Sequence, residues 1–163
     1  MDTPKTNPAL TTSRPLVGVA TILLSSLHPQ CILLGRRLSS HGTGTYQLPG
    51  GHLEYGESFV NCARRELQEE TNLTLNSVPK LVYVTNNLFE DIGKHYVTLF
   101  MLAQLDDEQE LLKLKCMEPT KCDEWKWVKW TDLKQLNLFK PLETTVNEGF
   151  NPFLIEKGTI LSP

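Results

Sequence analysis

Residues 51–73 of the chain read GHLEYGESFVNCARRELQEETNL, and this stretch predicts both a local fold and a chemistry. A helical pattern begins near Ser58 and continues to the end of the stretch. Within the helix, Glu66, Glu69 and Glu70 occupy positions i, i+3 and i+4, so their carboxylates share one face. The stretch therefore predicts an amphipathic helix with concentrated negative charge near its C-terminal end.

The same helix carries a separate apolar stripe by which it would pack against a core. The stripe consists of Phe59, Val60, Ala63 and Leu67. Because each residue turns the helix by about 100°, Glu66 and Glu70 should lie beside the stripe and Glu69 farther round, toward solvent. Two of the three carboxylates are thus expected at the edge of the core.

These three glutamates pose an electrostatic problem. Like charges at this spacing repel one another, and anions near a helix C-terminus also oppose the helix dipole. A hard divalent cation such as Mg²⁺ or Mn²⁺ would relieve both effects, since it prefers carboxylate and carbonyl oxygens as ligands. The alternative is a solvated acidic face that binds nothing. The position of the cluster in the last turns of the helix favours a metal site.

The spacing of these residues resembles the Nudix box. Gly51, Glu57, the run 65–67 and the pair 69–70 occupy the positions of that motif. One position departs, because the family has a glycine where this chain has Asn72. Asparagine adopts the left-handed conformation that ends a helix more readily than other non-glycine residues. We therefore expect the change to be tolerated.

The resemblance covers roughly residues 16–153 and implies an α+β fold, the Nudix-type α/β/α sandwich with a mixed β-sheet. We predict a Nudix hydrolase domain over residues 15–155, with flexible tails at 1–14 and 156–163. Hydrophobic patterning predicts strands at 16–24, 31–34, 46–48, 78–85, 95–105 and 124–128. The remaining elements are a connection at 86–94, a solvated mobile excursion at 106–115, a helix start near 131 and a helix at 141–148.

The resemblance also implies a cofactor and its ligands. Glu66 and Glu70 would be the principal ligands of Mg²⁺ or Mn²⁺, with Glu69 assisting. The carbonyl oxygen of Gly50 would be a further ligand, delivered by a glycine pair that lets the backbone approach the metal closely.

A catalytic set follows from the same motif. Its members are Glu57, Arg65, Glu66, Glu69 and Glu70. Arg65 would pair with Glu57 and fix the helix against the preceding loop. Either Glu66 or Glu69 would orient or deprotonate the attacking water, and the sequence does not choose between them.

Candidate substrate-binding residues lie outside the helix and are carried over from the resemblance. They are Arg37, Gln47, Leu48, His52, Thr98, Phe139 and Leu142. Gln47 and Leu48 would lie near a base and His52 near the phosphates, with Thr98 in the pocket wall and the last two on its far side. Strand alternation puts Arg36 and Arg37 on opposite faces, and the resemblance favours Arg37 as a phosphate contact.

The implied reaction is hydrolysis of a diphosphate linkage. Stretches such as Gln47–Glu54 and Gly149–Phe153 resemble plant cytosolic MutT-type Nudix hydrolases and mammalian diphosphatases of oxidised or thiopurine nucleotides. This subgroup converts nucleoside triphosphates such as 8-oxo-dGTP to the monophosphate and pyrophosphate. Relatives have an aromatic residue where this chain has Lys140, an exchange that argues against purine stacking. Dihydroneopterin triphosphate, NADH or a prenyl diphosphate is an alternative substrate, and a non-catalytic nucleotide-binding module is an alternative function.

Composition limits the partners. A net charge of −3 over 163 residues gives no general attraction to polymeric nucleic acid or to an anionic membrane. We expect a small-molecule nucleotide or other diphosphate as the partner, and the resemblance implies a homodimer. Residues 1–14 lack the apolar segment of a secretory signal, so a cytoplasmic location is expected, with an organelle transit peptide as the alternative.

The cysteines do not show the paired spacing of a zinc site. Cys31 and Cys62 lie in apolar runs and are expected to be buried thiols. Cys116 and Cys122 are expected in a polar loop. Reduced thiols agree with the expected cytoplasmic location.

Overall fold

The computed structural model describes residues 14–155. The tails predicted at 1–14 and 156–163 lie outside these residues, apart from Arg14. No helix among the described residues is long and apolar enough to cross a membrane.

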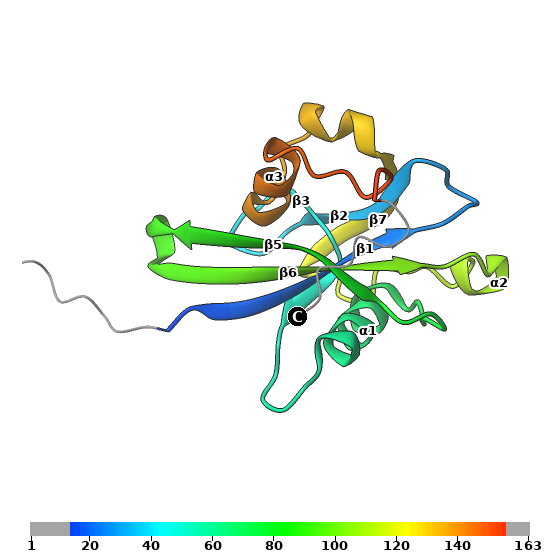
Figure 1. The fold of residues 1–163 in the computed structure, drawn as a ribbon, viewed down its shortest axis with the longest axis horizontal. Coiled ribbons are helices and arrows are strands. Elements are labelled where there is room, and N and C mark those ends of the chain that lie inside the picture. The colour runs from blue at the N-terminus through cyan, green and yellow to red at the C-terminus, as the bar shows by residue number, and fades with distance from the viewer. Residues whose placement is uncertain (1–13, 156–163) are drawn as a thin grey trace, which may run out of the picture.

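A four-stranded mixed sheet forms one half of the central layer (Figure 1). Its strands, in spatial order, are β4 (Gly50–His52), β1 (Leu16–Leu24), β6 (Lys94–Gln104) and β5 (Lys80–Phe89). β1 and β6 are parallel, whereas β4 and β5 join the sheet antiparallel to their neighbours. This arrangement confirms the predicted mixed sheet.

A three-stranded antiparallel sheet forms the other half. Its spatial order is β3 (Tyr46–Gln47), β2 (Cys31–Arg37) and β7 (Cys122–Lys129). The backbone of Tyr46 also pairs with the segment before the last helix, since its N–H donates to the Asn137 carbonyl and its carbonyl accepts from the Phe139 N–H, both at 2.8 Å. β3 therefore holds Phe139 in place.

Helices cover both sides of these strands in Figure 1, as the predicted sandwich requires. The helical elements are α1 (Phe59–Thr71), η1 (Glu90–Ile92), α2 (Glu108–Leu111), η2 (Trp130–Gln135) and α3 (Lys140–Asn147). α1 packs against β4, β1 and β6, and α3 packs against β5. The α+β fold class is thus confirmed.

The continuous apolar run in β1 is explained by burial on both faces. Ile22 belongs to a core cluster with Leu142 of α3, whereas its neighbour Leu23 belongs to a cluster with Leu67 of α1. Both β1 side chains are fully buried. One strand thus serves the two helical layers.

The apolar stripe predicted for α1 is correct only in part. Ala63 and Leu67 are fully buried, but Phe59 is 40% exposed. Phe59 begins the helix beside the exposed loop that precedes it, so no sheet covers its ring. Cys62 and Thr71 are buried instead and complete the packing face.

Two predicted boundaries were wrong. β5 continues to Phe89, through the asparagines predicted as a connection, because Thr85, Asn87 and Phe89 alternate inward and are buried. The segment 106–115 is not a solvated excursion throughout, since α2 forms there and Glu110 is only 8% exposed. The Glu110 carboxylate accepts from the Thr74 N–H at 2.7 Å and from the Lys113 ammonium at 2.6 Å, which satisfies a charge in a buried position.

The cysteines also depart from expectation. Cys62 is buried as predicted, but Cys31 begins β2 and is only partly buried. Cys122 was predicted in a polar loop, but it begins β7 and is buried, because this part of the chain pairs with β2 in the sheet. All four cysteines lie within the described residues, and each is a free thiol.

The ends of α1 show why the sequence forms a helix there. The Ser58 hydroxyl accepts from the Asn61 N–H at 3.2 Å and caps the N-terminus. Asn72 ends the helix with φ 63° and ψ 14°, the left-handed conformation expected from the sequence. Its side-chain amide also donates to the Lys113 carbonyl at 3.1 Å. Asparagine thus fixes the helix end to the backbone just after α2, which a glycine could not do.

We expect Asn72→Ala to lower the free energy of unfolding by about 1–2 kcal/mol, since a non-glycine side chain without polar groups is strained at this φ. Asn72→Gly should cost less, because it removes the hydrogen bond to Lys113 and leaves the backbone unstrained. Urea denaturation of both variants and the wild type measures the difference. Equal loss in the two variants would show that the left-handed backbone is unimportant.

Candidate active site

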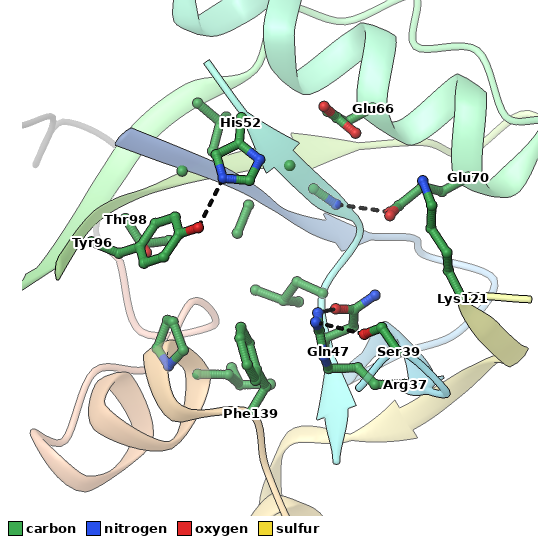
Figure 2. Close-up of a pocket in the computed structure, with 18 of the residues that line it drawn as sticks. Arg37, Ser39, Gln47, His52, Glu66, Glu70, Tyr96, Thr98, Lys121 and Phe139 are labelled. Atoms are coloured by element: carbon green, nitrogen blue, oxygen red, sulfur yellow. Dashed lines mark hydrogen bonds between the residues drawn. The ribbon is translucent and has the colours of Figure 1, made fainter. Parts of the chain in front are cut away.

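One cavity of about 500 Å³ collects most of the predicted site residues (Figure 2). Those that line it are Arg37, Gln47, Leu48, Gly50, His52, Glu66, Glu69, Glu70, Thr98, Phe139 and Leu142. Glu57 and Arg65 do not line the cavity and act behind it. The structure therefore brings residues from β2, β3, β4, α1, β6 and α3 to a single place.

The carboxylate end of the cavity depends on the contact between Gly51 and Glu66. A Cβ atom added at Gly51 would lie 2.3 Å from Glu66 Oε1. Such a distance is far below van der Waals contact, so a side chain at Gly51 would displace the Glu66 carboxylate from its present position. Gly50 is constrained from the other side, where a Cβ would lie 2.2 Å from the Val19 carbonyl oxygen.

Glu70 is the most strongly perturbed acid in the cavity. Burial raises the pKa of Glu70 to about 8, and the charges of Glu66 and Glu118 act in the same direction. The Gly50 N–H opposes them by donating to Glu70 Oε2 at 2.9 Å (Figure 2). Burial also raises the pKa of Glu66. Both acids are desolvated, but they differ in their partners: Glu66 pairs with Arg65 at 2.8 Å, whereas Glu70 makes no ion pair within the described residues.

Arg65 organises the outer side of the same helix. Its guanidinium pairs with Glu57 at 2.8 Å, with Glu66 at 2.8 Å and with Glu69 at 3.2 Å. It also donates to the His52 carbonyl at 3.1 Å. The pair predicted between Arg65 and Glu57 is thus present, and it ties α1 to the loop that follows β4.

The donor set fits a hard divalent cation, although it is not fully assembled. Among residues 14–155, no three His, Cys, Asp or Glu side chains form a ready-made metal site. The reason is geometric, because Glu69 is 57% exposed and is held outward by Arg65. Glu66 and Glu70 supply carboxylate oxygens, which are ligands of the type that Mg²⁺ and Mn²⁺ prefer. A cation here would also offset the burial, and the repulsion from Glu66 and Glu118, that raise the pKa of Glu70.

The opposite end of the cavity is aromatic. Phe139 stacks on Phe89 with ring centroids 5.7 Å apart and an interplanar angle of 26°. The His41 ring meets Phe89 edge-on at 4.8 Å and Phe139 at 5.6 Å. His41 Nε2 is buried and has no hydrogen-bond partner within the described part of the chain. This end therefore offers flat apolar faces together with a polar atom that is free to bind a ligand.

Arg37 lies at this aromatic end. Its guanidinium carbon is 4.2 Å from the centre of the Phe139 ring, and its N–H groups donate to Gln47, to Ser39 and to the His41 carbonyl. Burial lowers the pKa of Arg37. Arg36 points away and pairs with Asp123, as the alternation of a strand requires. The phosphate contact predicted for Arg37 stays a prediction, because its present partners belong to the wall of the cavity.

His52 and Tyr96 lie between the two ends (Figure 2). His52 Nε2 and the Tyr96 hydroxyl are 2.9 Å apart, and the Tyr96 ring meets Phe89 edge-on at 5.7 Å. Thr98 follows Tyr96 on the same face of β6 and lines the cavity beside it. A polar bridge thus joins the carboxylate end to the aromatic end.

Lys140 does not line the main cavity. The sequence suggested that this lysine, in place of the aromatic residue of relatives, would disturb purine stacking. Its ammonium group donates to the Leu88 carbonyl and lies 5.3 Å from the centre of the Phe89 ring. Phe139 alone of the pair lines the cavity. The cation therefore does not occupy the place where a planar base would stack.

Several lining residues were not among the sequence predictions. They are Ser39, His41, Glu54, Phe89, Tyr96, Glu118 and Lys121, with small and apolar residues of β1 and β6. Glu118 and Lys121 come from a loop about fifty residues beyond the helix that they face. The only sequence signal was their place in a charged stretch before β7, which does not distinguish a site residue from a solvated one.

Comparison with known proteins agrees with this geometry. The family profile described as NUDIX domain matches residues 14–148. The chain belongs to the Nudix family. Nudix hydrolases generally use divalent metal ions.

Nudix relatives of known description share the sequence at moderate identity. Oxidized purine nucleoside triphosphate hydrolase of Danio rerio is 29% identical over 114 residues, covering 70% of this chain and 66% of that protein. Nudix hydrolase 25 of Arabidopsis thaliana is 28% identical over 163 residues, covering 89% of this chain and 90% of that protein. The crystal structure of a MutT NUDIX hydrolase from Burkholderia pseudomallei superposes with a TM-score of 0.71 at 22% identity, covering 85% of this chain and all of that one. This last likeness confirms the fold.

The chain spans only part of some Nudix relatives. It covers 66% of the Danio rerio protein, and 40% and 44% of two other curated relatives. Activity and substrate are therefore proposed from the site itself.

The Glu57–Arg65 pair predicts a pH-dependent contribution to stability. Hydrogen bonding to Arg65 lowers the pKa of Glu57 to about 2, below its ordinary value of 4.5. A carboxylate with a lowered folded-state pKa stabilises the protein above its unfolded-state pKa, and this stabilisation is lost as the pH falls toward about 2. Glu57→Gln should therefore unfold more easily at pH 7, by about 1 kcal/mol after allowance for solvent.

Thermal or urea unfolding of wild type and Glu57→Gln from pH 7 to pH 2 measures this contribution. The difference between the two proteins should be constant above pH 5 and shrink toward zero below pH 4.5. A difference that does not change with pH would show that Glu57 acts by packing alone.

Proposed function

We propose that the chain is a divalent-cation-dependent pyrophosphohydrolase of nucleoside triphosphates, with an oxidised purine nucleotide such as 8-oxo-dGTP as its substrate. One observation carries the proposal. A single cavity has several carboxylates at one end and stacked aromatic rings with polar groups at the other. A nucleotide has the same two ends, since its phosphates require a cation and its base requires flat apolar faces.

The carboxylate end would bind the triphosphate. Glu66, Glu70 and the Gly50 carbonyl would hold a divalent cation, with Glu69 assisting after release from Arg65. A bound Mg²⁺ or Mn²⁺ would neutralise the phosphate oxygens and activate the attacking water. Arg65 would keep α1 seated on the glycine loop while the chemistry proceeds, through its pair with Glu57.

The proposed reaction is a hydrolysis in which one water molecule forms one new P–O bond, and the bridging oxygen stays on the other phosphorus. The α–β phosphoanhydride bond breaks, the water oxygen joins the α-phosphorus or the β-phosphorus, and pyrophosphate and a monophosphate leave. A glutamate of the box, Glu66 or Glu69, would take the proton from the water. Only Glu69 of these two is largely exposed.

The aromatic end would hold the base. Phe139 and Phe89 provide a stacking face, while Gln47, Thr98 and the unpaired His41 Nε2 provide hydrogen bonds. Leu48 and Leu142 complete the walls. These polar groups favour a heterocycle over a prenyl chain, because an apolar ligand would leave them buried and unsatisfied. A pterin is a second candidate, since it is also flat and hydrogen-bonding.

The Danio rerio relative is named for oxidised purine nucleoside triphosphates, which supports the choice of substrate. Other relatives are named RNA pyrophosphohydrolase. The net charge of −3 does not favour a polymer over a mononucleotide. A homodimer and a cytoplasmic location, implied by the sequence resemblance, are part of the proposal.

A substrate panel tests the proposal. With Mg²⁺ present, 8-oxo-dGTP and dGTP should release pyrophosphate, and EDTA should abolish the release, since the carboxylates alone cannot neutralise the phosphates. The other members are dihydroneopterin triphosphate, NADH, geranyl diphosphate and a 5′-triphosphorylated oligoribonucleotide, each assayed at equal concentration. Phosphate-product analysis measures all of them.

The panel decides between the alternatives. Faster turnover of a non-nucleotide would replace the proposed substrate, and binding of nucleotide without any turnover would indicate a binding module. Phe139→Leu should raise KM for dGTP about tenfold by loss of stacking. Lys140→Met is the matched control, because that side chain lies outside the cavity.

Glu70→Gln should lower kcat at least about 100-fold, because an amide is a poor replacement for a ligand of a catalytic metal. Steady-state kinetics with saturating Mg²⁺ measures the effect. Glu124→Gln, a change of the same kind at an exposed strand residue, should retain wild-type turnover. Wild-type turnover in Glu70→Gln would remove Glu70 from the metal site.

A further inference from the structure

The charges that line the cavity are unbalanced. Five glutamates line it, namely Glu54, Glu66, Glu69, Glu70 and Glu118. Among the described lining residues, the lysine and arginine side chains are only Arg37 and Lys121. Arg37 is engaged at the aromatic end. Lys121 is thus the cation of the cavity that faces the carboxylate end.

The Lys121 side chain is directed into the carboxylates. Its ammonium group donates to Glu118 Oε1 at 2.7 Å. Figure 2 shows the side chain extending toward the Glu70 carboxylate. The hydrogen bond to Glu118 raises the pKa of Lys121, and the charges of Glu70 and Glu66 act in the same direction. Lys121 in turn opposes the rise in the pKa of Glu70.

The backbone holds Lys121 in this position from two sides. The Lys121 carbonyl accepts from the Leu38 N–H at 2.8 Å, and its N–H donates to the Glu118 carbonyl at 2.9 Å. The same loop is fixed to α1, because the Met117 N–H donates to the Glu70 carbonyl at 3.0 Å. Glu70 also accepts from the Trp125 indole N–H at 3.1 Å on its backbone carbonyl. The loop and the end of the helix therefore form one hydrogen-bonded unit.

We propose that Lys121 is a counter-cation held by Glu118 beside the Glu70 carboxylate, and that its positive charge opposes the binding of a divalent cation at Glu70. The lysine and the divalent cation compete because both are attracted to the same cluster of carboxylates. Lys121 stabilises the acidic cavity before the cation arrives and weakens the affinity for the cation by the same interaction. The inference rests on the proposed function, because it needs a divalent cation at Glu66 and Glu70.

The test measures cation affinity without any substrate. Mn²⁺ is titrated into the full chain, and electron paramagnetic resonance measures the free ion. Lys121→Met removes the charge and keeps a long flexible side chain. It should bind Mn²⁺ about 3- to 10-fold more tightly than the wild type, a modest gain because the lysine side chain is 65% exposed. The gain should diminish as ionic strength rises.

Lys113→Met is the matched control. Lys113 also pairs with a glutamate three residues before it, at 2.6 Å, but it does not line the cavity. Its Mn²⁺ affinity should equal that of the wild type. An equal gain in Lys113→Met and Lys121→Met would mean that net charge alone sets the affinity, which would overturn the inference.

The remaining outcomes separate this inference from the proposed function. If the wild type binds Mn²⁺ and Lys121→Met binds it equally or more weakly, Lys121 is not a competitor and the inference fails alone. If neither protein binds Mn²⁺, the metal site of the proposed function fails, and the inference with it. Lys121→Gln provides a second variant, and circular dichroism with thermal unfolding checks that both variants are folded.

Discussion

The contact between the acidic end of α1 and the glycine loop before it is the constraint on which the rest of the site depends. Glu66 lies where a side chain on Gly51 would be, and Glu70 accepts from the Gly50 N–H at 2.9 Å. Both carboxylates are thereby largely removed from water. This arrangement costs free energy in the absence of a cation, which is visible in the pKa of about 8 for Glu70.

Each carboxylate near the helix is compensated from a different part of the chain. Arg65 compensates Glu57, Glu66 and Glu69 from within the helix. The Gly50 N–H compensates Glu70 from the glycine loop, and Lys121 compensates Glu118 from within the loop that precedes β7. Glu70, which has only a backbone N–H as partner, is therefore less completely compensated than the carboxylates that pair with Arg65. Under the proposed function, the cation would bind beside Glu70, which lines the cavity.

The architecture gives the cavity its two unlike ends. β4 and α1 deliver the carboxylates, while β3 holds the segment that carries Phe139. The two sheets meet between these elements, and Tyr96 and Thr98 of β6 line the space that joins them. A ligand with a charged end and a flat end matches this arrangement better than a ligand with either feature alone.

The sequence by itself determined the elements whose signals are local. The period of the acidic and apolar residues predicted α1, and strand alternation separated Arg36 from Arg37. The motif spacing predicted the Nudix fold, and Asn72 was recognised as a left-handed helix end. Boundaries failed at β5 because inward-facing Thr85 and Asn87 are buried by tertiary packing, which overrides their local preference.

Only the tertiary structure decided which charges meet. The loop of Glu118 and Lys121 is joined to α1 by the Met117 N–H and to the segment after β2 by the Leu38 N–H, and nothing in the local sequence marks those partners. Lys140, adjacent to Phe139, was turned out of the cavity by its contact with the Leu88 carbonyl. Local sequence sets the face on which a side chain lies, whereas the partner of that side chain depends on which distant segments pack beside it. Many charged side chains in the cavity belong to segments far apart in the chain, so the local sequence does not reveal which of them lie close together.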